Sequence, residues 1–258
     1  MSELFKIWMI ACPLVFVAGF VDSVAGGGGI ISIPAYMLAG MPTYLTLGTN
    51  KLVACMGTAL SSVKYFRSGR VVVKIAALAA LGSLAGSFIG TNLALLIPER
   101  ILRTVVLVAL PLVALFLIRR REFGQNGSQR KQMPPVKETV LALGSGVCIG
   151  LYDGLVGPGT GTFFILAFTG VFGMDLLTSS GCAKISNLAS NIMSTVIYLI
   201  SGKIWFAVAV PAIVCCMLGN YAGARYAIRG GSGNVRKIMF LVLVLLFIKI
   251  GLELTGVL

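Results

Sequence analysis

The sequence has no histidine and few charged residues. Of its 258 residues only 8 are Asp or Glu, charged residues make up 11%, and hydrophobic residues make up 57%. A soluble globule of this length needs far more polar surface, so the composition places the chain in a membrane. The apolar runs recur along the whole length, and the N-terminus, MSELFK, lacks the basic region and cleavage site of a signal peptide. We therefore expect an all-α integral membrane protein whose first span stays in the mature chain.

The sequence lacks the residue patterns that metal sites and disulfide frameworks need. The six cysteines lie in apolar segments without CxxC or Cys/His spacing, so neither a zinc site nor a disulfide framework is expected. No pair of nucleophile and base is recognisable, so we expect neither an enzyme nor a bound cofactor. The 21 Lys plus Arg come without a nucleic-acid-binding motif. In a membrane protein such an excess indicates cytoplasmic loops and contacts with anionic lipid.

Two parts of the chain are copies of one unit. The segment GFVDSVAGGGG, residues 19–29, matches GLYDGLVGPGT, residues 150–160, at an offset of 131. After a slip of two residues the offset is 133, and it places Lys51 on Lys184. We therefore divide the chain into a first membrane repeat (1–118), a cytoplasmic linker (119–137) and a second membrane repeat (138–258).

Each repeat opens with an apolar stretch that is too long for one crossing. Between Lys6 and Lys51 lie 44 residues whose only charge is Asp22, whereas about 20 helical residues cross a bilayer. We expect two segments there, broken at the glycines, and about five membrane segments per repeat, 8–10 in total. The loop around Ser68 is basic whereas its partner around Ser201 is not, so the halves are predicted to form an inverted repeat. Four crossings per half with a re-entrant glycine loop, giving parallel repeats, are the alternative.

The glycine-rich breaks are candidates for a substrate site. Breaks at matching places in two repeats mark the site of many secondary transporters, because unwound backbone and the positive end of a helix favour an anion. A phosphate-binding P-loop is excluded, since neither GGGGIIS nor GPGTGTF is followed by Gly-Lys-Ser/Thr. Close helix packing is the alternative use of such glycines, and it is the use expected of the glycines at i, i+4 spacing elsewhere in the repeats, namely Gly82, Gly86, Gly90, Gly219 and Gly223. The candidate residues of the breaks are Gly27, Gly28, Gly29, Gly159 and Thr160.

Lys51 and Lys184 occupy the same position in the two repeats, within apolar sequence. A lysine at the bilayer centre costs about 2.5–3.5 kcal/mol on insertion scales, so its presence in both copies indicates that the charge is used. Asn187 and Asn191 share a helical face with Lys184, and two ammonium groups with amides and hydroxyls would suit a small oxyanion. Snorkelling of both lysines to a membrane surface is the alternative.

Asp22 and Asp153 are the acidic residues of the two breaks. They could cap a helix, pair with the lysines or carry a proton, and capping is the preferred interpretation. Because the chain has no histidine and Glu3, Glu99, Glu122 and Glu138 are expected in termini or loops, few other intramembrane groups could carry a proton. Arg225, whose repeat partner is Asn92, breaks the symmetry and either reaches the site or faces cytoplasmic lipid.

The two glycine motifs, together with LGTNKL at 47–52 and AKISNLASN at 183–191, resemble the sulfite exporter TauE/SafE family, also called the 4-toluenesulfonate uptake permeases. The resemblance covers nearly the whole chain. It implies transport of small sulfur-containing oxyanions, such as sulfite, sulfoacetate or isethionate, across a bacterial inner membrane. It also assigns to the site the residues Asn50, Lys51, Lys184, Asn187 and Asn191.

We therefore expect a secondary active transporter that couples anion movement to protons and alternates access to the two sides of the membrane. Its partners would be the anion, protons and membrane lipids, with no nucleic acid, cofactor or metal. A passive anion channel is the alternative, because pores also use rings of basic residues.

Overall fold

The computed structural model describes residues 3–106, 108 and 131–254, and the secondary structure of this part of the chain is helical throughout. In both repeats a long helix is followed by a short one and then by long ones. The predicted linker at 119–137 and the fifth segment of the first repeat lie largely outside the described residues. The helices are α1 (Glu3–Ala25), α2 (Gly29–Leu38), α3 (Thr43–Arg67), α4 (Val73–Leu96), α6 (Pro135–Leu155), α7 (Thr160–Phe172), α8 (Leu176–Ile200) and α9 (Phe206–Leu254), which kinks at Gly231.

Both opening helices end at the glycine-rich segments, as predicted. Gly26 after α1 and Gly157 and Gly159 after α6 have left-handed backbone, with φ of +79°, +91° and +80°. Residues with a Cβ rarely adopt this conformation, so the chain leaves the helix there. The helices that follow, α2 with 10 residues and α7 with 13, extend only about 15 and 20 Å at 1.5 Å per residue. Each is too short to cross a bilayer by itself.

The same tripeptide pattern ends the third helix of each repeat. SGR at 68–70 follows α3 and SGK at 201–203 follows α8, with Gly69 at φ +71° and Gly202 at φ +65°. In both turns the residue after the glycine donates its N–H to the carbonyl five residues back, from Arg70 to Tyr65 and from Lys203 to Tyr198. This is the Schellman arrangement of helix ends. The repeated sequence therefore builds the same turn twice.

Each repeat packs its first helix against the fourth helix of the other repeat. α1 lies along α9, and α6 lies along α4. Glycines at i, i+4 spacing make this possible, because a Cβ at these positions would overlap backbone atoms of the facing helix. For them the close-packing interpretation is confirmed. They are Gly82, Gly86 and Gly90 on α4, and Gly219 and Gly223 on α9.

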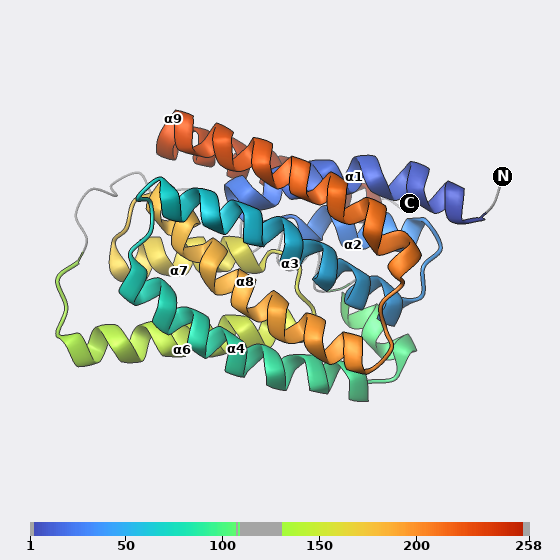
Figure 1. Cartoon of the computed structure of the whole chain (residues 1–258), viewed down its shortest axis with the longest axis horizontal. Helices are drawn as coiled ribbons and strands as arrows, with labels where there is room; N and C mark the ends of the chain where they lie inside the picture. Colours follow the sequence, from blue (N-terminus) through green and yellow to red (C-terminus); the bar gives the residue numbers. More distant parts are fainter. Residues whose placement is uncertain (1–2, 107, 109–130, 255–258) are drawn as a thin grey trace.

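Matching helices of the two repeats run in opposite directions. Figure 1 shows α1 and α3 running from right to left, and α6 and α8 from left to right. The start of α3 accordingly lies beside the end of α8, where Gly48 contacts the backbone of Lys203, and Gly181 near the start of α8 contacts that of Arg70. The two contacts are equivalent under the offset of 133. This arrangement is the one expected of an inverted repeat.

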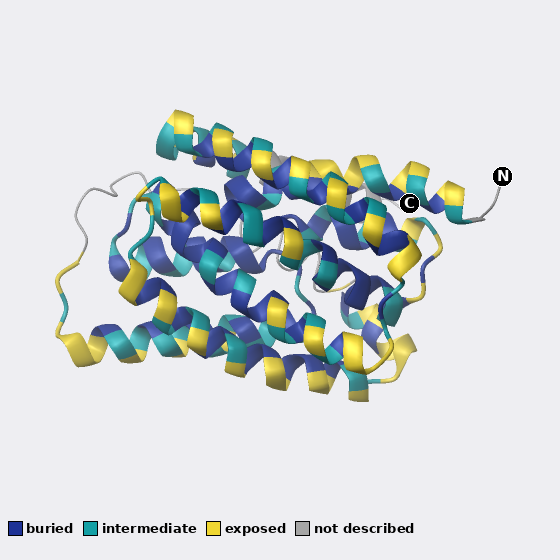
Figure 2. Ribbon diagram, viewed as in Figure 1, coloured by how far each residue is buried: buried dark blue, intermediate teal, exposed yellow. Residues whose placement is uncertain are grey.

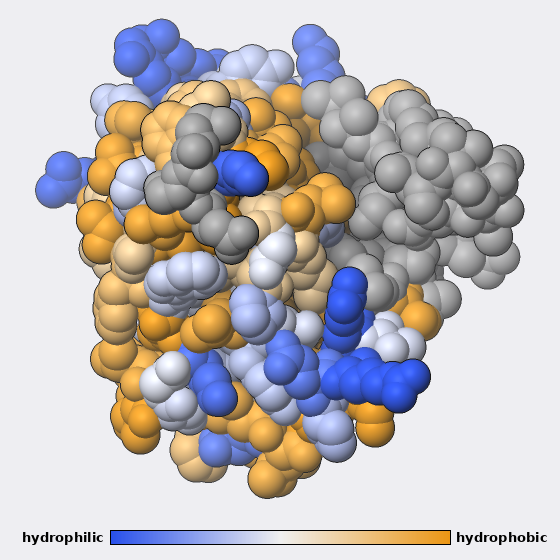
Figure 3. Space-filling model, turned by 90° about the vertical axis from the view of Figure 1, so that its right-hand side faces the viewer, coloured by the Kyte–Doolittle hydropathy of each residue, from blue (hydrophilic) through white to orange (hydrophobic). Residues whose placement is uncertain are grey.

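The outward faces of the outer helices are apolar. Buried residues occupy the centre of the bundle and exposed residues line its outside (Figure 2), and the exposed set includes large hydrophobic side chains such as Leu81, Phe88, Val214 and Leu218. Hydrophobic surface extends over the end of the molecule as well, with clusters of hydrophilic side chains between (Figure 3). Within the described residues, three helices are long and apolar enough to cross a membrane: Leu4–Ala25, Val73–Leu96 and Phe206–Phe240. The chain is therefore a membrane protein, with α3 and α8 carrying buried polar residues in its interior.

Candidate functional site

The two glycine-rich breaks touch each other in the middle of the bundle. Gly26 lies directly against the backbone of Gly161, so closely that a Cβ at either position would overlap the other. The hydroxyl of Thr162 donates to the carbonyl of Ala25 at 2.8 Å, and Gly29 lies against Pro158. Glycine is therefore needed here both for the turn and for the close approach of the two repeats.

The breaks leave backbone donors free. Within the described residues no acceptor is present for the N–H groups of Gly27, Gly28 and Gly29, nor for those of Gly159, Gly161 and Thr162. No side chain caps α2 or α7. The first turns of these two short helices therefore present unpaired N–H groups and the positive ends of their dipoles.

Lys51 extends from α3 to the second repeat. Its ammonium nitrogen lies 2.7 Å from Oδ2 of Asp153 and donates to the backbone carbonyl of the same residue at 2.6 Å. The side chains of Lys51 and Asp153 are 5% and 3% exposed, so water screens the pair little. Two hydroxyls also lie against the carboxylate, with Thr160 Oγ1 at 2.7 Å from Oδ1 and Ser190 Oγ at 2.6 Å from Oδ2.

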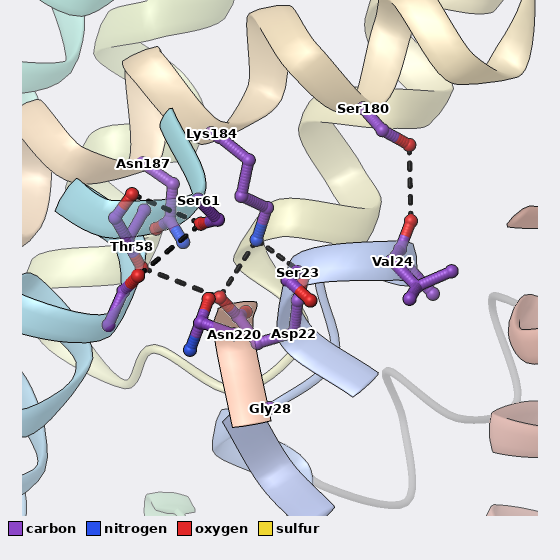
Figure 4. A network of polar contacts seen from close by, with 12 residues as sticks. Asp22, Ser23, Val24, Gly28, Thr58, Ser61, Ser180, Lys184, Asn187 and Asn220 are labelled. Carbon is purple, nitrogen blue, oxygen red and sulfur yellow. Dashed lines mark hydrogen bonds and ion pairs between the residues drawn. The ribbon is translucent and has the colours of Figure 1, made fainter. Parts of the chain in front are cut away.

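Lys184 makes the matching contact in the opposite direction. It extends from α8 to the first repeat, where its ammonium lies 2.8 Å from Oδ2 of Asp22 and also donates to the carbonyl of Asp22 (Figure 4). The Lys184 side chain is fully buried and that of Asp22 is 13% exposed. Thr58 on α3 contacts the same carboxylate oxygen at 3.4 Å. Each lysine therefore binds the aspartate of the other repeat.

These contacts decide between the interpretations of the charged residues. Snorkelling is excluded, because both lysines are buried. The preferred interpretation of Asp22 and Asp153 as helix caps is wrong for this structure, since within the described residues their carboxylates accept from lysines and hydroxyls and from no backbone N–H. The two lysines also do not form one doubly positive cluster, because a carboxylate neutralises each of them.

A small polar cavity lies between the breaks and the central helices. Its volume of about 30 Å³ has room for only a few water molecules. Asp22, Lys51 and Asp153 all line it, whereas Lys184 is not among the lining residues and lies behind Asp22. The remaining lining residues are Gly26, Gly29, Asn50, Ala54, Gly157, Thr160, Gly161, Asn187 and Asn191.

Three amides give the cavity hydrogen-bonding capacity. Asn50 accepts a hydrogen bond from the hydroxyl of Ser32 at 2.6 Å through its Oδ1. Asn187 and Asn191 are 5% and 3% exposed, and Oδ1 of Asn187 has no partner within the described residues. A buried acceptor without a partner is costly, so this amide oxygen is available to a hydrogen-bond donor in the cavity.

The other predicted residues of the breaks lie around this cavity in different ways. Gly29 and Thr160 line it, and Gly28 packs against the side chain of Asp22. Gly27 and Gly159 belong to the breaks but are not among its lining residues.

The structure does not bring Arg225 to the cavity. Its side chain is exposed on α9, whereas the neighbouring Gly223 and Ala224 are buried. Gly223 contacts α1. Because its side chain is exposed while these neighbours face the bundle, the structure does not support the interpretation that Arg225 reaches the site.

Two polar contacts of the site escaped the sequence reasoning. Ser190 binds the carboxylate of Asp153, and Ser32 binds Asn50. The position of Ser190 three residues after Asn187 on the same helix was a usable signal, because residues at i and i+3 share a face. Ser32 carried no such signal, since it meets Asn50 across two helices. The part of the chain that the structure describes contains no group of three or more Cys, Asp or Glu side chains that could hold a metal ion.

The sequence model of the family described as sulfite exporter TauE/SafE matches residues 11–250. This match includes both repeats, both breaks and all four charged residues of the site. The chain belongs to the TauE/SafE family.

Curated relatives agree with the assignment to this family of membrane transporters. A probable membrane transporter protein, ORF9, from a Sinorhizobium species is 34% identical over 91% of this chain and 88% of its own. The probable membrane transporter YfcA of Escherichia coli K12 is 32% identical over 87% of this chain and 82% of its own. A probable membrane transporter of Haemophilus influenzae is 34% identical over 86% and 85%. No solved structure matches the chain.

Proposed function

We propose that this TauE/SafE protein is a secondary active transporter that carries small sulfur-containing oxyanions, either sulfite or organosulfonates such as isethionate or sulfoacetate, across the bacterial inner membrane with protons. The observation that carries the proposal is the central cavity, which Asp22, Lys51 and Asp153 line beside the free N–H groups of two helix starts, with Lys184 paired to Asp22 behind it. The family description supports the choice of substrate.

The chemistry of the cavity suits a small oxyanion. The S–O groups of sulfite and sulfonates accept hydrogen bonds. They donate none unless one of the oxygens is protonated. The cavity offers donors of every kind that such groups use: an ammonium, amides, a hydroxyl and backbone N–H groups at helix starts. Asn50, Lys51, Asn187 and Asn191 would contact the anion directly, because all four line the cavity.

The arrangement also supports alternating access. A cavity of about 30 Å³ is too small for a sulfonate, so the site has to widen to admit one. The site is built between the repeats, and matching helices run in opposite directions (Figure 1). Rocking one inverted repeat against the other would open the site to either side in turn, with the crossed ion pairs holding the repeats together between openings.

Purified protein in sealed liposomes tests the proposal. Wild-type vesicles should accumulate [³⁵S]sulfite above its equilibrium level when the outside is made more acidic than the inside, so that the proton gradient is directed inward. Isethionate should compete, whereas chloride should not. Downhill equilibration that ignores the pH gradient would instead indicate a passive channel. No flux of either anion above that of protein-free liposomes would contradict a role in their transport.

Variants of the site lysine give the matched comparison. Lys51→Met should lower sulfite uptake at least tenfold, because the cavity loses its ammonium donor. Lys74→Met is the control, since Lys74 is exposed on α4 and pairs with Glu138 at 3.0 Å away from the cavity. Equal loss in both variants would show that the effect is not specific to the site.

A further inference from the structure

The two crossed ion pairs are unequal. The carboxylate of Asp153 has three close donors, namely Lys51 at 2.7 Å, Thr160 at 2.7 Å and Ser190 at 2.6 Å. Each hydroxyl also lies near a carbonyl of its own segment, but an ionised carboxylate is the stronger acceptor. Asp22 has one close donor, Lys184, and a single hydroxyl at 3.4 Å. A proton on Asp153 would therefore displace more hydrogen-bond donors than a proton on Asp22 would.

The inequality follows from the sequence of the two repeats. The partner of Thr160 at the offset of 131 is Gly29, and the partner of Ser190 at the offset of 133 is Gly57. The first repeat therefore lacks both hydroxyls that the second repeat directs at its aspartate. Asp22 is also the more accessible carboxylate, with 13% of its side chain exposed against 3% for Asp153.

The groups around Asp22 leave Lys184 as its direct charged partner. Gly28 packs against its side chain from the start of α2. Lys51 and Asp153 face the same cavity, already paired with each other. Among the residues that the structure describes, the other titratable groups that interact with it are Tyr65 of α3 and Cys216 of α9, both buried.

We propose that Asp22 is the carboxylate that takes up the transported proton, while Asp153 stays ionised as the fixed partner of Lys51. The inference rests on the proposed function. The proton bonds to the Asp22 carboxylate, and the Lys184 ammonium keeps its charge and its hydrogen bond to the Asp22 carbonyl, while the negative charge of the anion in the adjoining cavity replaces that of the neutralised carboxylate. When the anion leaves on the other side, Asp22 releases the proton there and pairs with Lys184 again.

Charge balance makes the two ions dependent on each other. The four charges of the site sum to zero, and an uncompensated charge is costly in a dry interior. A proton on Asp22 without an anion leaves Lys184 unpaired, and an anion without a proton adds a negative charge. Only the two together keep the site neutral. We therefore expect one proton for each monoanion.

An exchange assay separates Asp22 from Asp153. Liposomes are loaded with unlabelled sulfite, and entry of [³⁵S]sulfite is measured once at equal pH on both sides and once under an inward pH gradient. Asp22→Asn should slow exchange, but the exchange that remains should be equal with and without the pH gradient, with no accumulation driven by pH. Accumulation by Asp22→Asn, or exchange without accumulation in Asp153→Asn instead, would overturn the proposal. Absence of exchange in the wild type would contradict the proposed function itself.

A second variant supplies the missing hydroxyl without removing a charge. A Cβ at Gly29 meets its nearest neighbour, Pro158, at 3.4 Å, so the position admits a side chain that begins with a Cβ. Gly29→Ser should stabilise ionised Asp22, as Thr160 does for Asp153, and shift half-maximal uptake to more acidic pH by roughly one pH unit. Gly29→Ala adds the same bulk without the hydroxyl and should leave the pH dependence unchanged. The same pH dependence in both variants would contradict the proton site.

Discussion

Replacing Lys51 by methionine tests whether the crossed ion pair holds the two repeats together. Methionine keeps most of the length of the side chain but removes the charge. At 2.7 Å, the attraction between Lys51 and Asp153 is about 6 kcal/mol at an effective dielectric constant of about 20. Desolvation offsets part of this, and breaking a buried pair on one side typically costs 3–5 kcal/mol. We expect the lower end, about 3 kcal/mol, because Thr160 and Ser190 still bind the carboxylate.

A double-mutant cycle isolates the pair from the rest of the site. The free energy of unfolding of purified protein is measured in mixed micelles for wild type, Lys51→Met, Asp153→Asn and the double variant. The double variant should be more stable than the two single losses added together predict, by about 2 kcal/mol, because neither residue is left as a buried unpaired charge. A coupling energy below about 0.5 kcal/mol, or a Lys51→Met variant as stable as wild type, would refute the buried pairing.

Thermal unfolding in detergent checks the remaining predictions. Gly26→Ala should cost at least 3 kcal/mol or prevent folding, because its Cβ would overlap the facing repeat, whereas Gly69→Ala, also left-handed but with open space around it, should cost only about 1–2 kcal/mol; equal losses would contradict the close approach of the breaks. At the start of α8, burial raises the pKa of the Asp175 carboxyl, but hydrogen bonds from Thr178 and Ser232 outweigh it and hold that pKa below its ordinary value. Asp175→Ala should therefore cost about 1 kcal/mol at neutral pH. This contribution is present above the ordinary pKa of aspartate and is lost as the pH falls through the lowered value, so the difference in Tm from wild type should narrow in acid; a constant difference would exclude an ionised cap.

The sequence by itself determined the membrane location, the repeated unit, the breaks and the lysines. These features are local or compositional. The apolar content places the chain in a membrane. An offset of 131 or 133 residues identifies the two repeats, and consecutive glycines prevent a helix from continuing. The glycines at i, i+4 spacing likewise predicted close helix contacts, although the sequence did not show which helices would face them.

Only the tertiary structure decided which charges meet. Lys51 and Asp153 are 102 residues apart, and Lys184 and Asp22 are 162 apart, so no local pattern links them. The pairs form because each repeat packs its opening helix against the other repeat, which places each aspartate beside the lysine of the opposite half. The same packing turned the exposed Arg225 away from the cavity. A charge buried in a membrane protein takes whichever partner the helix packing brings within reach, and that choice is made in three dimensions.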